Sequence, residues 1–114
     1  MPGARGEAII QAGEREVRIL FTMRALAEAE REAGKPIAVM LSAQGFGIQE
    51  SAVLLRAGME AARRDARLGG TRVTLDAAFD LLEEIGLNAA GEAIGLAIAG
   101  ALAGSAEETD SPNP

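Results

Sequence analysis

The stretch EREVRILFTMRALAEAEREAG, residues 14–34, decides the fold because its hydrophobic pattern changes at Thr22. Before Thr22, Val17, Ile19 and Phe21 alternate with Glu16, Arg18 and Leu20, which approximates the pattern of a half-buried β-strand. After Thr22 the residues are mostly strong helix formers, up to Gly34. Thr22 can cap a helix by accepting a bond from a free backbone N–H, and Gly34 suits the left-handed position that ends a helix. The stretch therefore predicts a strand over residues 14–21 and a helix over residues 23–33.

Another strand is expected on the N-terminal side, over residues 7–12. Gly13 stands between the two strands and can adopt the positive φ angle of a tight turn. The start of the chain therefore predicts an antiparallel β-hairpin.

Four more helices are expected after Gly34, over residues 36–43, 48–68, 75–85 and 89–103. In the longest of them apolar residues recur at spacings of three and four, with the charged residues largely on the other side. Thr74 and Asn88 are expected as N-caps, and Gly86 as a helix stop. The sequence thus predicts a mainly α protein of the α+β class, with an N-terminal β-hairpin followed by a small bundle of about five helices.

The chain has 114 residues, enough for one domain with one core, which is expected over residues 1–104. Its apolar residues are mainly alanine and leucine, with three phenylalanines, so each buries little area and self-association would add stability. Residues 105–114 include Glu107, Glu108 and Asp110 and end in SPNP, which predicts a disordered acidic tail.

Cysteine and histidine are both absent, which removes thiol nucleophiles, thiolate and imidazole metal ligands and the commonest general base. We therefore expect no enzymatic activity, no small-molecule substrate and no cofactor or metal. Four carboxylates share part of one predicted helix face, and a solvated surface is favoured over a cation site for them. They are Asp76, Asp80, Glu83 and Glu84.

The net charge of −6 argues against nucleic acid as a partner, because a phosphate backbone is bound by clustered basic residues. No signal peptide is visible. The longest uncharged apolar run, residues 93–106, is shorter than the roughly 20 residues that span a membrane. We therefore expect a cytoplasmic protein that does not insert into a membrane.

A basic cluster stands out against the acidic whole. Pairing within the chain or a contact with an acidic partner protein is favoured over nucleic acid, since no aromatic residues are interleaved with it. The cluster consists of Arg56, Arg63, Arg64, Arg67 and Arg72.

Small residues recur at helical spacing in the last predicted helix. Such spacing allows close helix approach, so both tight packing on the core and a self-association surface explain it. The residues are Gly91, Gly95, Gly100 and Gly104.

The order of motifs along the chain resembles the tail assembly chaperone family of gene transfer agents and related siphophage-like particles. A strand ends on Thr22, and the helix that follows contains ALAEAE (residues 25–30) before its terminal Gly34. Later come a short helix, the motif VLLRAG (53–58), a glycine-rich turn, VTL (73–75) and an Ala- and Leu-rich closing helix. The resemblance covers nearly the whole predicted domain.

The resemblance implies a non-catalytic chaperone that binds the tape-measure protein transiently and keeps its long hydrophobic helices soluble. Tail-tube subunits would then displace or recruit the chaperone as the tube grows. It would act in the cytoplasm of the producing bacterial cell and be absent from the mature particle. Such a role needs an exposed aliphatic surface. The candidate surface residues, each with a core position as the slightly favoured alternative, are Ile37, Met40, Leu41, Phe46, Ile94, Ile98 and Leu102.

Two other functions are compatible with these residues. One is a permanent structural component of the particle, such as a tail or connector subunit. The other is a small protein-binding adaptor unrelated to phage. A homo-oligomer is possible under each of them.

Overall fold

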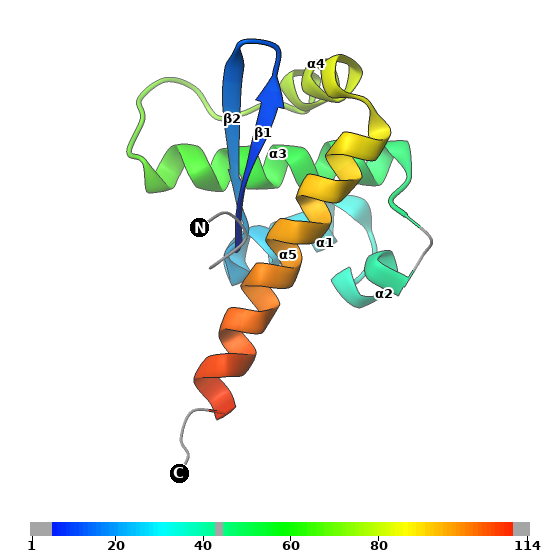
Figure 1. The fold of residues 1–114 in the computed structure, drawn as a ribbon, viewed down its shortest axis with the longest axis vertical. Helices are drawn as coiled ribbons and strands as arrows, with labels where there is room; N and C mark the ends of the chain where they lie inside the picture. The colour runs from blue at the N-terminus through cyan, green and yellow to red at the C-terminus, as the bar shows by residue number, and fades with distance from the viewer. Residues whose placement is uncertain (1–5, 43–44, 111–114) are drawn as a thin grey trace.

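The computed structural model describes residues 6–42 and 45–110, with side chains described as far as residue 103. Within these residues it confirms the predicted architecture of an antiparallel hairpin followed by five helices (Figure 1). The strands are β1 (Glu7–Ala12) and β2 (Arg15–Leu20). The helices are α1 (Met23–Ala33), α2 (Ile37–Ser42), α3 (Ile48–Asp65), α4 (Leu75–Ile85) and α5 (Leu87–Asp110).

The hairpin turns tightly at Gly13, which has the positive φ angle of 64° expected for a short turn. The register pairs Ile10 with Val17 and Ala8 with Ile19. One further hydrogen bond, from Phe21 N to Gly6 O at 2.8 Å, continues the pairing beyond the strands. One face of the hairpin is apolar and packs on the helices, whereas the other face is mostly polar.

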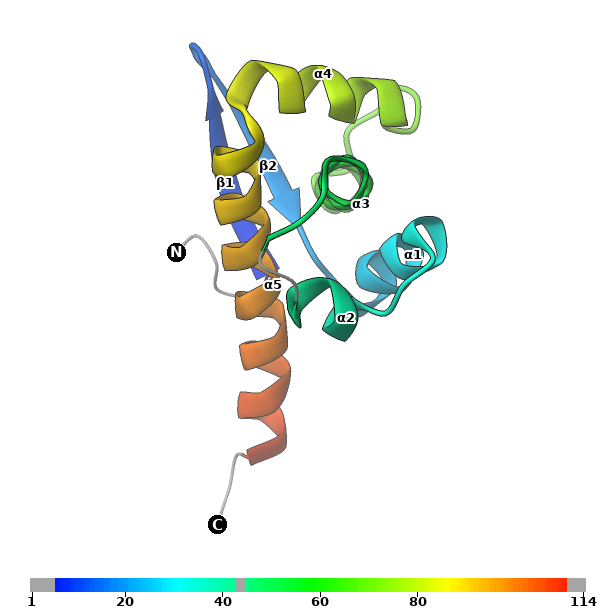
Figure 2. The same cartoon turned by 90° about the vertical axis from the view of Figure 1, so that its right-hand side faces the viewer.

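Helix α3 lies at the centre of the fold (Figure 2). Three groups of elements lie around α3: the hairpin and α5 on one side, α4 on a second side, and α1 and α2 on a third side. Residues 51–58 of α3 are therefore all buried. The prediction that charged residues of this helix lie on an exposed side was wrong for Arg56 and Glu60, which are 7% and 1% exposed. Periodicity assumes one buried face, and here neighbours surround the helix.

Gly58 allows β2 to cross directly over α3. A Cβ atom at this position would lie 2.9 Å from Ile19 Cβ and 3.2 Å from Phe21 Cζ. Ile19 and Phe21 are fully buried, with 0% and 1% of their surface exposed. The absence of a side chain on α3 at this point thus sets the distance between the sheet and the central helix.

The helix boundaries follow local capping rules where the caps act alone. Thr22 Oγ1 accepts a hydrogen bond from Ala25 N, and Thr74 Oγ1 accepts one from Ala77 N. Gly34 ends α1 in the left-handed conformation, with φ 77°. Helix α3 stops earlier than predicted, at Asp65, because Arg67 adopts a left-handed φ of 58°.

Helix α5 departs from the prediction at both ends. It begins at Leu87, so Asn88 is not its N-cap. Gly86 has a φ of 89° and serves both helices: its N–H donates to Leu82 O, and its carbonyl accepts from Ala90 N. At the other end α5 continues to Asp110, through part of the segment predicted to be disordered. No proline interrupts this alanine-rich stretch before Pro112, and residues 111–114 lie outside the described part.

Replacing Gly58 with alanine is expected to destabilise the protein by about 1–3 kcal/mol, because Ile19 must move to make room for the new methyl group. Gly91→Ala is the matched control, since nothing lies within 4 Å of a Cβ there. That substitution is expected to stabilise helix α5 by about 0.5–1 kcal/mol. Urea denaturation of both variants measures the difference. Equal stability of the two would contradict close packing at Gly58.

Candidate protein-binding surface

Helix α5 presents an apolar strip to the outside of the molecule. Ile94 and Ile98, which lie on the opposite side of the helix from Leu96, are fully buried against the body. No charged residue occurs between Glu92 and residue 105. The part of α5 toward the C-terminus extends beyond the rest of the fold (Figures 1 and 2). We call the exposed residues here the α5 strip: Leu96, Ala99, Leu102 and Ala103.

The α5 strip is the part of this helix that could receive a partner. Leu96 is 52% exposed and Leu102 is 39% exposed, although both are large apolar residues. A helix that is apolar on all sides is ordinarily covered on all sides. Within the described residues α5 is covered on one side only, so its outer side leaves apolar surface uncovered.

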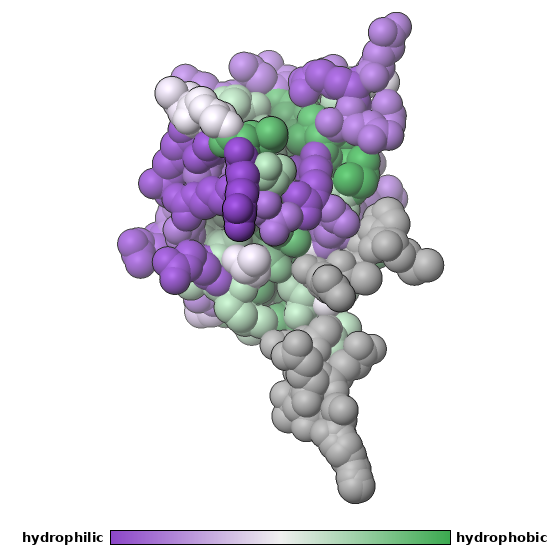
Figure 3. Space-filling view, turned by 90° about the vertical axis from the view of Figure 1, so that its left-hand side faces the viewer, coloured by the Kyte–Doolittle hydropathy of each residue, from purple (hydrophilic) through white to green (hydrophobic). Residues whose placement is uncertain are grey.

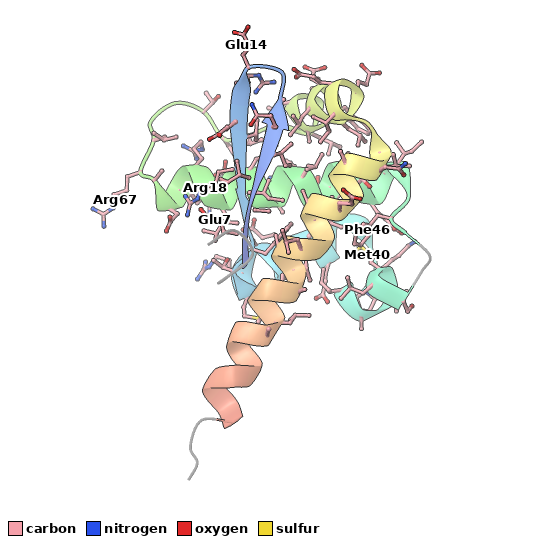
Figure 4. The ribbon with its side chains drawn as sticks, viewed as in Figure 1. Glu7, Glu14, Arg18, Met40, Phe46 and Arg67 are labelled. Carbon is pink, nitrogen blue, oxygen red and sulfur yellow. The ribbon has the colours of Figure 1, made fainter. Side chains whose placement is uncertain are left out.

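A groove lies where the loop before α3 approaches the start of α5. It has a volume of about 430 Å³ and is lined by Phe46, Leu87 and Gly91, together with Gly45, Gly47 and Asn88. Phe46 is half-buried and, with Met40, lies on the α2 side of α5 (Figure 4). Two separate sequence candidates, Phe46 and Gly91, are therefore neighbours in the fold.

The seven candidate surface residues divide between core and surface. Ile37, Met40, Ile94 and Ile98 are buried in the core. Leu41 and Leu102 are about 40% and 39% exposed, and Phe46 lies between these extremes. The buried residues are those on the sides of α2 and α5 that face the remaining elements.

Other exposed apolar residues were not among the sequence candidates. They include Val39, Ile48 and Leu96, all more than half exposed. The pattern of α5 could not distinguish Leu96 from Ile94, because apolar residues occur on every side of that helix. The only feature of the sequence that indicated an exposed apolar side of α5 was the uncharged run, which has no helical period.

Two of the four α5 glycines predicted to allow close packing, Gly91 and Gly95, have no close neighbour among the described residues. A Cβ atom at Gly91 or Gly95 would meet no atom within 4 Å. Gly100 is half-exposed, and Gly104 lies in the part of α5 whose side chains are not described. Close packing on the core therefore does not account for Gly91 and Gly95, whose open sides allow a second helix to approach closely.

The basic cluster is largely neutralised within the chain. Arg56 donates to Glu32 at 2.9 Å, and Arg72 lies 3.9 Å from Glu28. Arg63 and Arg64 both donate to Glu60, at 2.8 and 2.9 Å. Arg67 points away from the body at the end of α3 (Figure 4). The five residues thus do not form one continuous basic surface.

Glu60 is a buried junction of several hydrogen bonds. Its carboxylate accepts from Arg63, Arg64 and the backbone N–H of Val73, the last at 2.9 Å. The hydrogen bond from Arg63 is the main cause that lowers the pKa of Glu60 to about 2, and burial acts in the opposite direction. Through the bond from Val73, Glu60 holds the segment between α3 and α4 against the central helix.

The predicted carboxylates of α4 do not gather into a site. Glu84 pairs with Arg15 of the hairpin at 2.9 Å. Throughout residues 6–42 and 45–103, no group of three or more acidic side chains is placed to hold a metal ion. No single helix in that part of the chain is long and apolar enough to cross a membrane. Helices α4 and α5 taken together are long and apolar enough, but the chain bends by 115° at their junction.

Comparison with known proteins gives no relative: no protein-family model, no curated protein and no solved structure matches this chain.

Replacing Glu60 with glutamine is expected to destabilise the protein by about 1–3 kcal/mol, because the amide N–H group would face N–H donors of Arg63 and Arg64 at a buried position where a carboxylate oxygen now accepts from both. Glu83→Gln, on the exposed surface of α4, is the control and should change stability by less than about 0.5 kcal/mol. Thermal and urea denaturation measure both. Equal, small effects would show that the Glu60 network contributes nothing.

Acid should remove the contribution of Glu60. Its pKa is lowered from 4.5 to about 2 in the folded protein, so the unfolded chain binds the proton more readily. The stabilisation is therefore complete above about pH 4.5 and is lost as the pH falls toward 2. Denaturation of the wild type and of Glu60→Gln across this range should give a stability difference that shrinks with acidity. A difference independent of pH would contradict this assignment.

Proposed function

We propose that this protein is a non-catalytic tail assembly chaperone, which binds apolar helical segments of a tape-measure protein through the α5 strip. It would act in the cytoplasm of a bacterial cell that produces phage-like particles, assist tail-tube assembly and be absent from the finished particle. The observation that carries the proposal is the uncharged stretch of helix α5 after Glu92, which the rest of the described fold covers on one side only. The resemblance in the order of sequence motifs supplies the identity of the partner.

The α5 strip suits an amphipathic helix as its ligand. A partner helix could pack its apolar side along Leu96 and Leu102, while Ala99 and Ala103 between them let the two backbones come close. Because the strip has no charge, the partner needs no matching charged residue. The net charge of −6 is carried elsewhere and would keep the complex dispersed.

The size of the strip favours transient binding over permanent assembly. Complete burial of a leucine contributes about 1.5–3 kcal/mol, and this strip has only two leucines. Association itself costs at least about 4 kcal/mol in lost translational and rotational freedom. A partner held mainly by these contacts would dissociate readily, as a chaperone requires.

The proposal is tested by affinity capture of the tagged protein from particle-producing cells, with mass spectrometry of the bound proteins and of the released particles. Capture of a long, helix-rich tape-measure protein, with this chain missing from the particles, is the expected result. Recovery of the chain in stoichiometric amounts inside particles would identify a structural component instead. Absence of both associations would leave the adaptor function.

Replacing Leu96 and Leu102 together with glutamate is expected to reduce capture of the tape-measure protein by at least about tenfold, because both charges would be buried against an apolar helix. Met23→Glu is the control: Met23 is 53% exposed, lies at the start of α1 and does not belong to the strip. Circular dichroism verifies that both variants fold. Unchanged capture by the double variant would place the binding surface elsewhere.

A further inference from the structure

Among the described residues, no strand pairs with the outer edge of β2. In the described part of the chain the sheet has two strands, and α5 packs beside β1, the other strand. Because Phe21 bonds to Gly6 and the register alternates from there, every second residue of β2 directs its backbone groups away from β1. These residues are Glu16, Arg18 and Leu20.

A groove runs beside this open edge. It has a volume of about 340 Å³ and lies between β2, α3 and the segment that leads to α4. Most of its lining is apolar, as supplied by Val17, Met59, Ala62, Ala66, Leu68 and Val73. This side of the molecule is mainly hydrophilic, with hydrophobic areas between the charged residues (Figure 3). A strand added along β2 would place alternate side chains over the groove.

The charges of β2 are complementary to those of a second β2. In an antiparallel pair with Val17 opposite Val17, Glu16 of each copy lies opposite Arg18 of the other. The pair would hold two such ion pairs, related by the twofold axis. A shift of the pairing by two residues would use the same backbone groups but would put Arg18 opposite Arg18, where like charges repel. The strand therefore specifies both its partner and its register.

We propose that two copies of this chain associate through β2, joining their hairpins into one four-stranded antiparallel sheet. The backbone groups of Glu16 and Arg18 form the ladder, and the two Val17 side chains meet over the apolar grooves. The interface is isologous, as most dimer interfaces are.

Arg18 already has partners that it would exchange. It donates to Glu7 on the same sheet, which lies near it in Figure 4, and to Asp65 at the end of α3, the latter at 2.8 Å. The Asp65 side chain is 55% exposed, so this bridge is an exposed one of small net strength. In the dimer, Glu16 of the second copy would take the place of Asp65 as a partner of Arg18. The number of ion pairs would stay the same, and the edge of β2 would be free for pairing.

Such a dimer leaves the α5 strip accessible, because α5 lies beside β1 and the contact is made by β2. Each dimer would present two strips. Two weak sites that engage one long partner bind it more tightly than either site does alone.

The charge pattern allows a decisive test by analytical ultracentrifugation. The wild type is expected to dimerise as its concentration rises. Glu16→Arg alone and Arg18→Glu alone should each weaken dimerisation by at least about tenfold, because like charges then face each other. An equimolar mixture of the two variants, and the double variant Glu16→Arg/Arg18→Glu, should restore it. Circular dichroism verifies folding.

Asp65→Asn is a further variant, which frees Arg18 and removes a negative charge from the C-terminus of α3. It should tighten dimerisation several-fold, because Arg18 no longer has to leave the Asp65 carboxylate, and the loss of an unfavourable charge at the C-terminus of α3 keeps that helix stable. A wild type that stays monomeric at all concentrations would overturn the proposal. So would a dimer that resists the single charge changes but is lost in the Leu96→Glu/Leu102→Glu variant, since α5 would then be the contact.

Discussion

The close approach of β2 to α3 at Gly58 is the constraint on which the rest of the fold depends. Ile19 and Phe21 fill the space above a residue that has no side chain, so the sheet lies directly on the central helix. Helices α1, α4 and α5 then pack against α3 or the hairpin, and α2 packs against α1. An alanine- and leucine-rich sequence has few large side chains with which to fill gaps, and direct contact between backbone elements is its route to a dense core.

A helix surrounded on all sides must satisfy any charge that it carries. Arg56 and Glu60 both lie in the covered part of α3, and both have partners on neighbouring segments. Glu32 joins α1 to α3, and Val73 joins the connection before α4 to the same helix. Buried charges thus link the elements that the small apolar core holds only through short side chains, and breaking such a pair is costly because one charge is left alone.

The sequence predicts what is local and leaves open what depends on neighbours. Thr22, Gly34 and Thr74 act on the residues beside them, so the bounds of α1 and α4 were predicted correctly. The start of α5 was not, because Gly86 serves two helices at once. The burial of Arg56 and Glu60 was missed, since it arises from helices far away in the sequence. For the same reason the pattern of α5 could not separate the buried Ile94 from the exposed Leu96.

The two proposed binding surfaces differ in position and in chemistry: one is on helix α5, which packs against β1, and the other is the outer edge of β2. The α5 strip beside β1 has no charge, so it can recognise an apolar helix by shape and area and with little dependence on salt. The open edge of β2 carries Glu16 and Arg18, whose alternation matches a second copy and disfavours other registers. The charges on the edge of β2 therefore make it selective for a second copy, whereas the absence of charge on the α5 strip lets it accept different apolar helices. Because the two are separated by the hairpin, each could be occupied without blocking the other.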